Sequence, residues 1–502
     1  MMTLRRWIAA AIVALAVTAP IAAQEKQVTS TTEKKVDDTV QFPPLPADKT
    51  VKQSVTIAGR TINYEATIGT ISVRDEKGKE IGQVVYTSYV VPGAGVNRPV
   101  TFAFNGGPGA SSVYLNMGAV GPKRVQFGAQ GNAPSDSPVT TDNQNSWLDF
   151  TDLVFIDPIG TGFSRSLVDE EKTKKAFYAN DPDIKYLSKV VFDWLVKGGR
   201  LRSPKYIMGE SYGGYRAPRI AYELQSQIGV GVTGLVMVSP YLDPASGNGA
   251  SALSPLPWMI DLPSMAAAHL ESQGRLTPAA MAEIEAYTRG PFATDLLRGR
   301  ADPQATAQIV QHVTDLTGLD PALVRRMGGR VDSGTFLREI HRGDGTIGSV
   351  YDSNVTAFDP FPWSMQRQSN DPILDALIAP TTSAMVDFVT RIVGWKTDAR
   401  YHALSYAVNQ AWDRGKPDDT PVQDLRKAIA NDPHMGVMIA HGWDDLSCPF
   451  FASRLIVDQL PSFGMADRVK LDIYPGGHMF YSRPDSGAAF KADARALYAA
   501  HG

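Results

Sequence analysis

The stretch that decides the fold is Gly209-Glu210-Ser211-Tyr212-Gly213-Gly214. A short apolar run at 206–208 precedes it, and the residues at 215–224 after it are typical of a helix. Gly-x-Ser-x-Gly between an apolar strand and a helix predicts a sharp turn that exposes Ser211 at the carboxyl end of the strand. A serine hydroxyl is a weak nucleophile alone, so the turn predicts chemistry only if the chain supplies a base and an oxyanion site. Without them the stretch is a glycine-rich turn that happens to hold a serine.

Short, almost uniformly apolar runs separated by long helical stretches surround this turn. The runs lie at 100–104, 153–156, 206–208, 235–238, 437–440 and 469–474, and helices are predicted at 184–198, 215–227, 451–460 and 486–499. Such runs are typical of parallel strands covered by helices on both faces. Alternating apolar and polar residues between 51 and 90 predict antiparallel strands before them. The sequence therefore predicts an α/β architecture with a mixed, mostly parallel central sheet.

A long interval from 242 to 430 interrupts this pattern. It has few strand signals, and Thr277-Pro278 and Asp320-Pro321 are typical helix starts. An interval of this length is too long for a loop. We expect a mainly helical cap, inserted between the two parts of the core at 51–241 and 431–502. A cap over the carboxyl ends of the strands would wall a substrate cleft.

The amino-terminal residues predict export. Arg5-Arg6 is followed by an apolar run at 7–17 and by small residues before Gln24, which predicts a signal peptide over 1–23. The run is shorter than the roughly 20 residues of a membrane span, which disfavours the alternative of an uncleaved anchor. We expect a periplasmic or secreted protein with no stable membrane association after cleavage. The polar, proline-containing residues 24–50 are interpreted as a flexible lead-in.

Composition excludes several classes of function. A net charge of −3, from 49 basic and 52 acidic residues, gives no electrostatic case for a nucleic-acid partner. The sequence has no Cys/His cluster and no phosphate-binding loop, so neither a metal nor a cofactor is predicted. The single cysteine, Cys448, allows no intramolecular disulfide and is interpreted as a small buried residue rather than a reactive thiol. The oligomeric state is left open.

Candidate partners for Ser211 follow the last two predicted strands. Asp444 and Asp445 come after the strand at 437–440, and His478 follows the final strand behind two glycines. Sites on open α/β sheets form at the carboxyl ends of strands, where these residues would meet. Serine, aspartate, histidine is also the chain order of α/β-hydrolases. His478 is the predicted base, while spacing alone does not separate Asp444 from Asp445 as the acid.

An oxyanion site is predicted at the end of the strand at 100–104, which runs into Asn105-Gly106-Gly107-Pro108-Gly109. Glycines there let backbone N–H groups approach a developing negative charge closely. The N–H of Tyr212, the residue after the nucleophile, would be a second donor. One such donor is worth roughly 3 kcal/mol of transition-state stabilisation.

Several motifs in order resemble the serine carboxypeptidase family, peptidase family S10, in a bacterial-type exported form. They are Asn105-Gly-Gly-Pro-Gly-x-Ser-Ser112, Asn145-Ser-Trp147, Ile156-Asp-Pro-Ile-Gly-Thr-Gly-Phe-Ser164, Gly209-Glu-Ser-Tyr-Gly-Gly-Tyr-Arg-Ala-Pro218, Asp445-x-x-Cys-Pro449 and Gly477-His-Met479. The resemblance runs from about 90 to 480 and is weak within the expected cap.

This resemblance implies serine-dependent release of C-terminal residues from peptide substrates, with a preference for acidic pH. The implied roles are nucleophile for Ser211, base for His478, acid for Asp445, oxyanion donors for Gly107 and Tyr212, and binding of the substrate's terminal carboxylate for Asn105 and Glu210. Asp445 is chosen because the family's aspartate lies three residues before a cysteine or threonine. Glu210 could bind a carboxylate only if the two groups share a proton, which explains an acid optimum.

The chain departs from the family pattern at two positions. The better-known eukaryotic members have a tryptophan two residues before the asparagine and a second glutamate fourteen after it, where this chain has Ala103 and Ala119. Half of the carboxylate-binding set is therefore missing or supplied from elsewhere. This keeps two alternatives open: an acyltransferase or esterase that uses the same triad, and, more remotely, an inactive peptide-binding protein.

Overall fold

The computed structural model describes residues 42–125, 139–243, 253–364, 371–416, 419–463 and 468–502. The predicted signal peptide, and most of the predicted lead-in, lie outside the described residues. The first strand, β1, begins at Lys49. Asp48, just before it, accepts hydrogen bonds from the N–H of Thr70 and the hydroxyl of Tyr86. The ordered core therefore begins slightly earlier than the lead-in boundary at residue 50.

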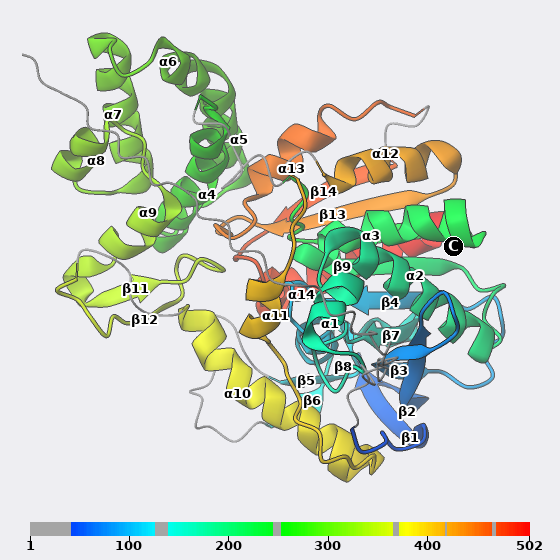
Figure 1. Cartoon of the computed structure of the whole chain (residues 1–502). Coiled ribbons are helices and arrows are strands. Elements are labelled where there is room, and N and C mark those ends of the chain that lie inside the picture. Colours follow the sequence, from blue (N-terminus) through cyan, green and yellow to red (C-terminus); the bar gives the residue numbers. More distant parts are fainter. Residues whose placement is uncertain (1–41, 126–138, 244–252, 365–370, 417–418, 464–467) are drawn as a thin grey trace, which may run out of the picture. The chain divides into compact units, whose positions relative to one another are not determined.

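One sheet holds most of the strands, in the order β1-β2-β3-β7-β4-β9-β10-β13-β14 (Figure 1). The strands are β1 (Lys49–Ile57), β2 (Arg60–Arg74), β3 (Glu80–Val90), β4 (Val100–Phe104), β7 (Asp152–Ile156), β9 (Lys205–Glu210), β10 (Gly234–Val238), β13 (Gly436–Gly442) and β14 (Val469–Tyr474), and β8 (Arg165–Ser166) pairs with β3. β5 (Lys123–Val125) and β6 (Thr140–Asp142) form a separate pair.

The sheet is mixed in the way the sequence predicts. β1, β2, β3 and β7 pair antiparallel to one another, and every pairing from β7 through β4, β9, β10 and β13 to β14 is parallel. All six predicted apolar runs are parallel strands. Their carboxyl ends therefore meet at one edge of the sheet.

Helices cover both faces because the side chains of each strand alternate between two cores. Phe102 and Phe104 of β4 pack in the cluster that contains residues of α2 (Asn180–Lys197), α3 (Tyr212–Glu223) and α12 (Pro421–Asn431). Ala103, between them, faces the cluster that contains residues of α10 (Pro372–Asp387) and α14 (Pro484–His501). The strands are consequently apolar at every position.

The interval between β10 and β13 is mainly helical, as predicted. Its helices are α4 (Leu256–Ser272), α5 (Pro278–Tyr287), α6 (Ala293–Arg298), α7 (Pro303–Thr317), α8 (Pro321–Met327), α9 (Ser333–Glu339), α10, α11 (Tyr406–Ala411) and α12. Thr277 and Asp320 cap α5 and α8 by accepting hydrogen bonds from the N–H groups of Ala280 and Leu323. A short hairpin, β11 (Thr346–Gly348) with β12 (Thr356–Phe358), was not predicted. α1 (Glu170–Phe177) and α13 (Phe450–Val457) complete the α-helices of the described chain.

One helical stretch in this interval, Pro372–Val393, is long and apolar enough to cross a membrane. Residues along it, including Leu377 and Met385, pack into the core cluster of the sheet. The ring of Phe388 lies 6.1 Å from the ring of Tyr89 on β3. This packing is typical of the core helix of a globular protein.

Candidate functional site

Ser211 lies at the turn between β9 and α3 with φ 60° and ψ −121°. A positive φ is rare for a residue with a β-carbon and costs of order 1–3 kcal/mol, so it persists only where the surroundings impose it. The N–H of Ser211 donates to the carbonyl of Val238 at 2.9 Å, which anchors the turn to β10. The flanking glycines are required because a β-carbon on Gly209 would collide with the carbonyl of Gly213. The turn therefore holds Ser211 half-buried at the edge where the parallel strands end.

His478 and Asp445 are joined by a hydrogen bond of 2.7 Å between Nδ1 and Oδ2, and both side chains are buried. The other carboxylate oxygen, Oδ1, accepts from the backbone N–H groups of Ser447 and Cys448 at 2.8 and 2.9 Å. Burial lowers the pKa of His478, but the charge and hydrogen bond of Asp445 raise it, and the net shift is upward. Asp445 is thus placed to orient the imidazole and to stabilise its protonated form.

Asp444 faces a different group of residues. Arg483 donates to Glu271 at 2.5 and 3.0 Å and to Asp352 at 2.8 Å, and its guanidinium lies 3.7 Å from Asp444. Burial and a hydrogen bond with Glu271 raise the pKa of Asp444 well above its ordinary value. Acidic oxygens of Glu271, Asp352 and Asp444 lie within 4.8 Å of one another, and Arg483 already supplies a cation to this group. The structure therefore separates the two adjacent aspartates that spacing left open.

Two residues that sequence reasoning missed hold His478 in place. The hydroxyl of Ser239 donates to the carbonyl of His478 at 2.9 Å. The N–H of His478 donates to the carbonyl of Tyr351, whose ring packs edge-on at 5.2 Å from the imidazole. Ser239 directly follows β10, so the strand-end rule could have found it. Tyr351 comes from the inserted interval and carries no sequence signal.

The loop after β4 lies directly against the turn that holds Ser211. A β-carbon on Gly106 would lie 2.5 Å from the nitrogen of Tyr212 and 2.9 Å from the β-carbon of Ser211. Gly107 adopts φ +100°, which favours glycine. Within the described chain, no hydrogen bond is recorded from the N–H of Gly107 or Tyr212. Both predicted oxyanion donors are thus beside the serine.

Arg216 ties this loop to the helix that follows the serine. Its Nη1 donates to the carbonyl of Asn105 at 2.8 Å, and its Nε donates to Asp183 at 2.7 Å. The side chains of Arg216 and Asp183 are both fully buried. The ion pair therefore joins α2, α3 and the loop after β4.

Asn105 and Glu210 are in contact, and a tyrosine joins them. The amide Nδ2 of Asn105 donates to Oε2 of Glu210 at 3.0 Å, and the hydroxyl of Tyr481 donates to the same oxygen at 2.8 Å. Burial raises the pKa of Glu210 to about 7, against the lowering effects of His478 and these two hydrogen bonds. Tyr481 belongs to a short helical turn at Phe480–Ser482 and had not been predicted as a site residue.

Two positions depart from the family pattern, Ala103 and Ala119. Ala103 and Ala119 are buried in the core cluster and bring no polar side chain to the site. Cys448 is also buried, and burial raises the pKa of its thiol well above the ordinary value. This environment is typical of an unreactive thiol.

A cavity of about 470 Å³ is lined in part by the loop that carries Asp445, and Ser211, Asp445 and His478 are not among its lining residues. The loops after β10 and β13 contribute one side of it, including Tyr241, whose N–H donates to the carbonyl of Ser211 at 3.0 Å. The amino-terminal part of α4 contributes Trp258 and Asp261. The inserted interval therefore walls a cavity beside the loop that carries Asp445.

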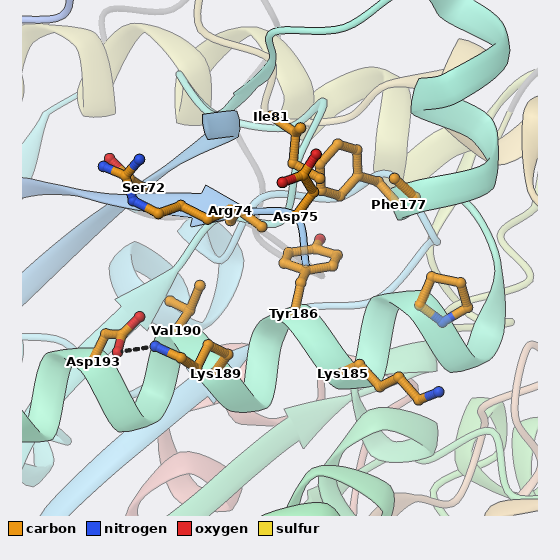
Figure 2. A pocket seen from close by; sticks show the side chains of 13 residues that line it. Ser72, Arg74, Asp75, Ile81, Phe177, Lys185, Tyr186, Lys189, Val190 and Asp193 are labelled. Atoms are coloured by element: carbon orange, nitrogen blue, oxygen red, sulfur yellow. Dashed lines mark hydrogen bonds and ion pairs between the residues drawn. The ribbon is translucent and has the colours of Figure 1, made fainter. Parts of the chain in front are cut away.

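Another cavity, of about 540 Å³, lies elsewhere and holds none of the predicted site residues. Figure 2 shows Phe177 and Tyr186 beside it, with the ion pair between Lys189 and Asp193 along α2. It is formed by the ends of β2 and β3 together with α1 and α2. It has no contact with the serine site.

The chain has the fold class of the α/β-hydrolases. The crystal structure of a prohormone-processing carboxypeptidase from Saccharomyces cerevisiae, KEX1(Δ)P, superposes with a TM-score of 0.54. It covers 86% of this chain and 91% of that chain at 16% identity, which supports the fold alone.

Within this class, the sequence supports the serine carboxypeptidase family, whose model matches residues 59–252. The pheromone-processing carboxypeptidase KEX1 of Yarrowia lipolytica is 32% identical over 152 residues, which are 30% of this chain and 23% of that protein. The vitellogenic carboxypeptidase of Aedes aegypti is 30% identical over 152 residues, 29% of each chain. Serine carboxypeptidase-like 36 of Arabidopsis thaliana is 26% identical over 207 residues, 40% of this chain and 39% of that protein.

The chain therefore spans between 23 and 39% of the length of these curated relatives. They are fungal, insect and plant proteins, and the expectation of a bacterial-type exported member stays a prediction.

Proposed function

We propose that this protein is a serine carboxypeptidase that releases C-terminal residues from peptides through an acyl-enzyme on Ser211. The observation that carries the proposal is the carboxyl group of Glu210, buried beside Asn105 and directly preceding the serine. A buried carboxyl group with a pKa of about 7 can hold a proton and donate it to a substrate carboxylate. An enzyme that acts on internal peptide bonds meets no terminal carboxylate for such a group to bind.

The residues divide the reaction as follows. The hydroxyl of Ser211 attacks the carbonyl carbon of the last peptide bond while Nε2 of His478 accepts its proton, and Asp445 stabilises the imidazolium. The N–H groups of Gly107 and Tyr212 would donate to the oxyanion. The protonated His478 then gives its proton to the leaving amino group as the C–N bond breaks. Water, deprotonated by His478, hydrolyses the ester and restores Ser211.

The pH dependence follows from the sign of the shift at Glu210. Below about pH 7 the carboxyl group is protonated and can pair with a carboxylate, while above it two negative charges would face each other. The advantage of a substrate with a free carboxylate is therefore expected at acid pH and lost as the pH rises through 7.

The first test is a pH series on two peptides that differ only in a free or an amidated C-terminus. We expect a ratio of kcat/KM that favours the free acid at pH 5 to 6 and falls above pH 7, and we expect Ser211→Ala to abolish both activities. Equal rates on both peptides would reject the carboxypeptidase in favour of an endopeptidase, esterase or acyltransferase. Failure of Ser211 to react with an organofluorophosphonate would instead indicate a binding protein.

The division of the chain is part of the proposal. We assign 51–241 and 431–502 to the catalytic core and 242–430 to a cap that lines the substrate cleft, supported by the cavity between α4 and the catalytic loops. We also assign 1–23 to a signal peptide that directs export to the periplasm or the exterior, supported by its basic head and short apolar run. Mass spectrometry of the amino terminus of the exported protein tests this assignment.

A further inference from the structure

The oxygens of the Glu210 carboxyl group are not equivalent. The hydroxyl of Tyr481 and the amide of Asn105 both donate to Oε2, at 2.8 and 3.0 Å, and no donor to Oε1 is recorded in the described chain. Tyr481 is only 2% exposed, so water does not compete for its hydroxyl. Tyr481 lies three residues after His478, in the segment that leaves the catalytic loop.

Both donors are fixed in direction. Oδ1 of Asn105 accepts from the N–H of Leu115 at 2.9 Å, which turns the amide NH₂ group toward Glu210. Burial, followed by the charge of Glu210, raises the pKa of Tyr481 well above its ordinary value, so the phenol keeps its proton and donates.

A neutral carboxyl group has one oxygen that accepts and one that carries the proton. An oxygen that already receives two hydrogen bonds is the acceptor, so the proton of Glu210 is directed to Oε1. We infer that Tyr481 is a positioning residue of the carboxylate site, which with Asn105 occupies Oε2 of Glu210 and keeps the carboxyl proton on Oε1 for a hydrogen bond to the substrate's terminal carboxylate. This inference rests on the proposed function and adds a residue to it.

Ala119 is 4% exposed and ends in a methyl group, so it offers no hydrogen bond to Glu210. The phenol that bonds to Glu210 comes from the segment that follows the catalytic histidine, where no sequence motif predicted a site residue.

The test is Tyr481→Phe, assayed on the free-acid and amidated peptides across pH 5 to 9. At acid pH we expect kcat/KM for the free acid to fall about tenfold, mainly through KM, because one hydrogen bond that orients the carboxyl group is lost. The rate on the amidated peptide should stay unchanged. The pH at which the preference for the free acid is lost should also rise, because the hydrogen bond from Tyr481 favours the charged form of Glu210 and the variant lacks it. Loss of packing alone would lower both rates and leave this pH unmoved.

Tyr474→Phe is the matched control. It removes a phenol hydroxyl that donates to the carboxylate of Asp493 at 2.7 Å. Tyr474 lies in the same core cluster as Tyr481 but outside the site. We expect it to leave the free-acid to amide ratio and its pH dependence unchanged.

Glu210→Gln gives an independent measurement. Its amide oxygen can accept from Tyr481 and Asn105 while its NH₂ group takes the place of the proton on Oε1. We expect the variant to keep a preference for the free acid that no longer falls above pH 7.

The possible failures are distinguishable. If wild type prefers the free acid but Tyr481→Phe keeps the same ratio and the same pH dependence, the inference about Tyr481 is wrong and the proposed function stands. If wild type shows no preference at all, both are overturned.

Discussion

At the scale of single residues, neighbouring acids in the catalytic loop have opposite environments. Asp445 accepts hydrogen bonds from two backbone N–H groups and is bonded to the imidazole of His478. Asp444, one residue earlier, faces Glu271 and Asp352, and burial and its hydrogen bond with Glu271 raise its pKa well above the ordinary value. The difference comes from the direction in which each side chain leaves the loop, which residue spacing does not encode.

This contrast gives a paired prediction. Asp445→Asn should lower kcat by about 10³- to 10⁴-fold, because an amide cannot stabilise the imidazolium or hold the required tautomer. Asp444→Asn should change kcat less than about threefold, because its side chain faces Arg483, Glu271 and Asp352 rather than the imidazole of His478. Steady-state kinetics of both variants on the free-acid peptide test which aspartate orients His478, and circular dichroism confirms that both variants are folded. A larger loss for Asp444→Asn than for Asp445→Asn would reverse the assignment of the acid.

At the scale of elements, the sheet could be predicted because apolar runs of three to six residues between helices have few other interpretations. The serine, the histidine and the oxyanion loop followed because each lies at the end of such a run. Tyr481 and Tyr351 could not be found in this way, since their roles depend on how a short turn and the inserted interval fold back onto the catalytic loops. The same limit applies to the β11–β12 hairpin, whose strands have three residues each.

The ion pair of Arg216 with Asp183 joins elements that sequence reasoning treated separately. Arg216→Met should lower the free energy of unfolding by about 3–5 kcal/mol, because it leaves a buried carboxyl group without its partner. Arg216→Met combined with Asp183→Leu should recover a large part of that loss, since no buried charge remains. Urea denaturation of the two single variants and the double variant gives the coupling energy directly. Equal stability of wild type and Arg216→Met would show that the pair does not hold α2 to α3.

At the scale of the whole molecule, the cavity of about 470 Å³ beside the loop of Asp445 is formed by the core and the inserted interval together. Neither Asn105 nor Glu210 lines this cavity. If that pair binds the terminal carboxylate, the departing residue lies on its side of the serine, and we expect the cavity to receive the side chain of the residue before the cleaved bond. Asp243, Asp261 and Asp332 line this cavity, and no lysine or arginine is among the described residues that do so.

This arrangement predicts a preference for a cationic side chain at the penultimate position of the peptide. Burial and the neighbouring Asp332 raise the pKa of Asp261 to about 7, so its charge, and the preference, should grow as the pH rises from 6 to 8. We expect peptides with penultimate lysine to exceed those with glutamate about tenfold in kcat/KM at pH 8, as one charge pair in a half-buried site would give. The ratio of kcat/KM for the two peptides at each pH does not depend on the titration of Glu210 and His478, because that titration affects both peptides equally. Asp261→Asn should reduce the ratio several-fold and remove most of its rise with pH. A ratio near one in the wild type would mean that the cavity does not receive this side chain.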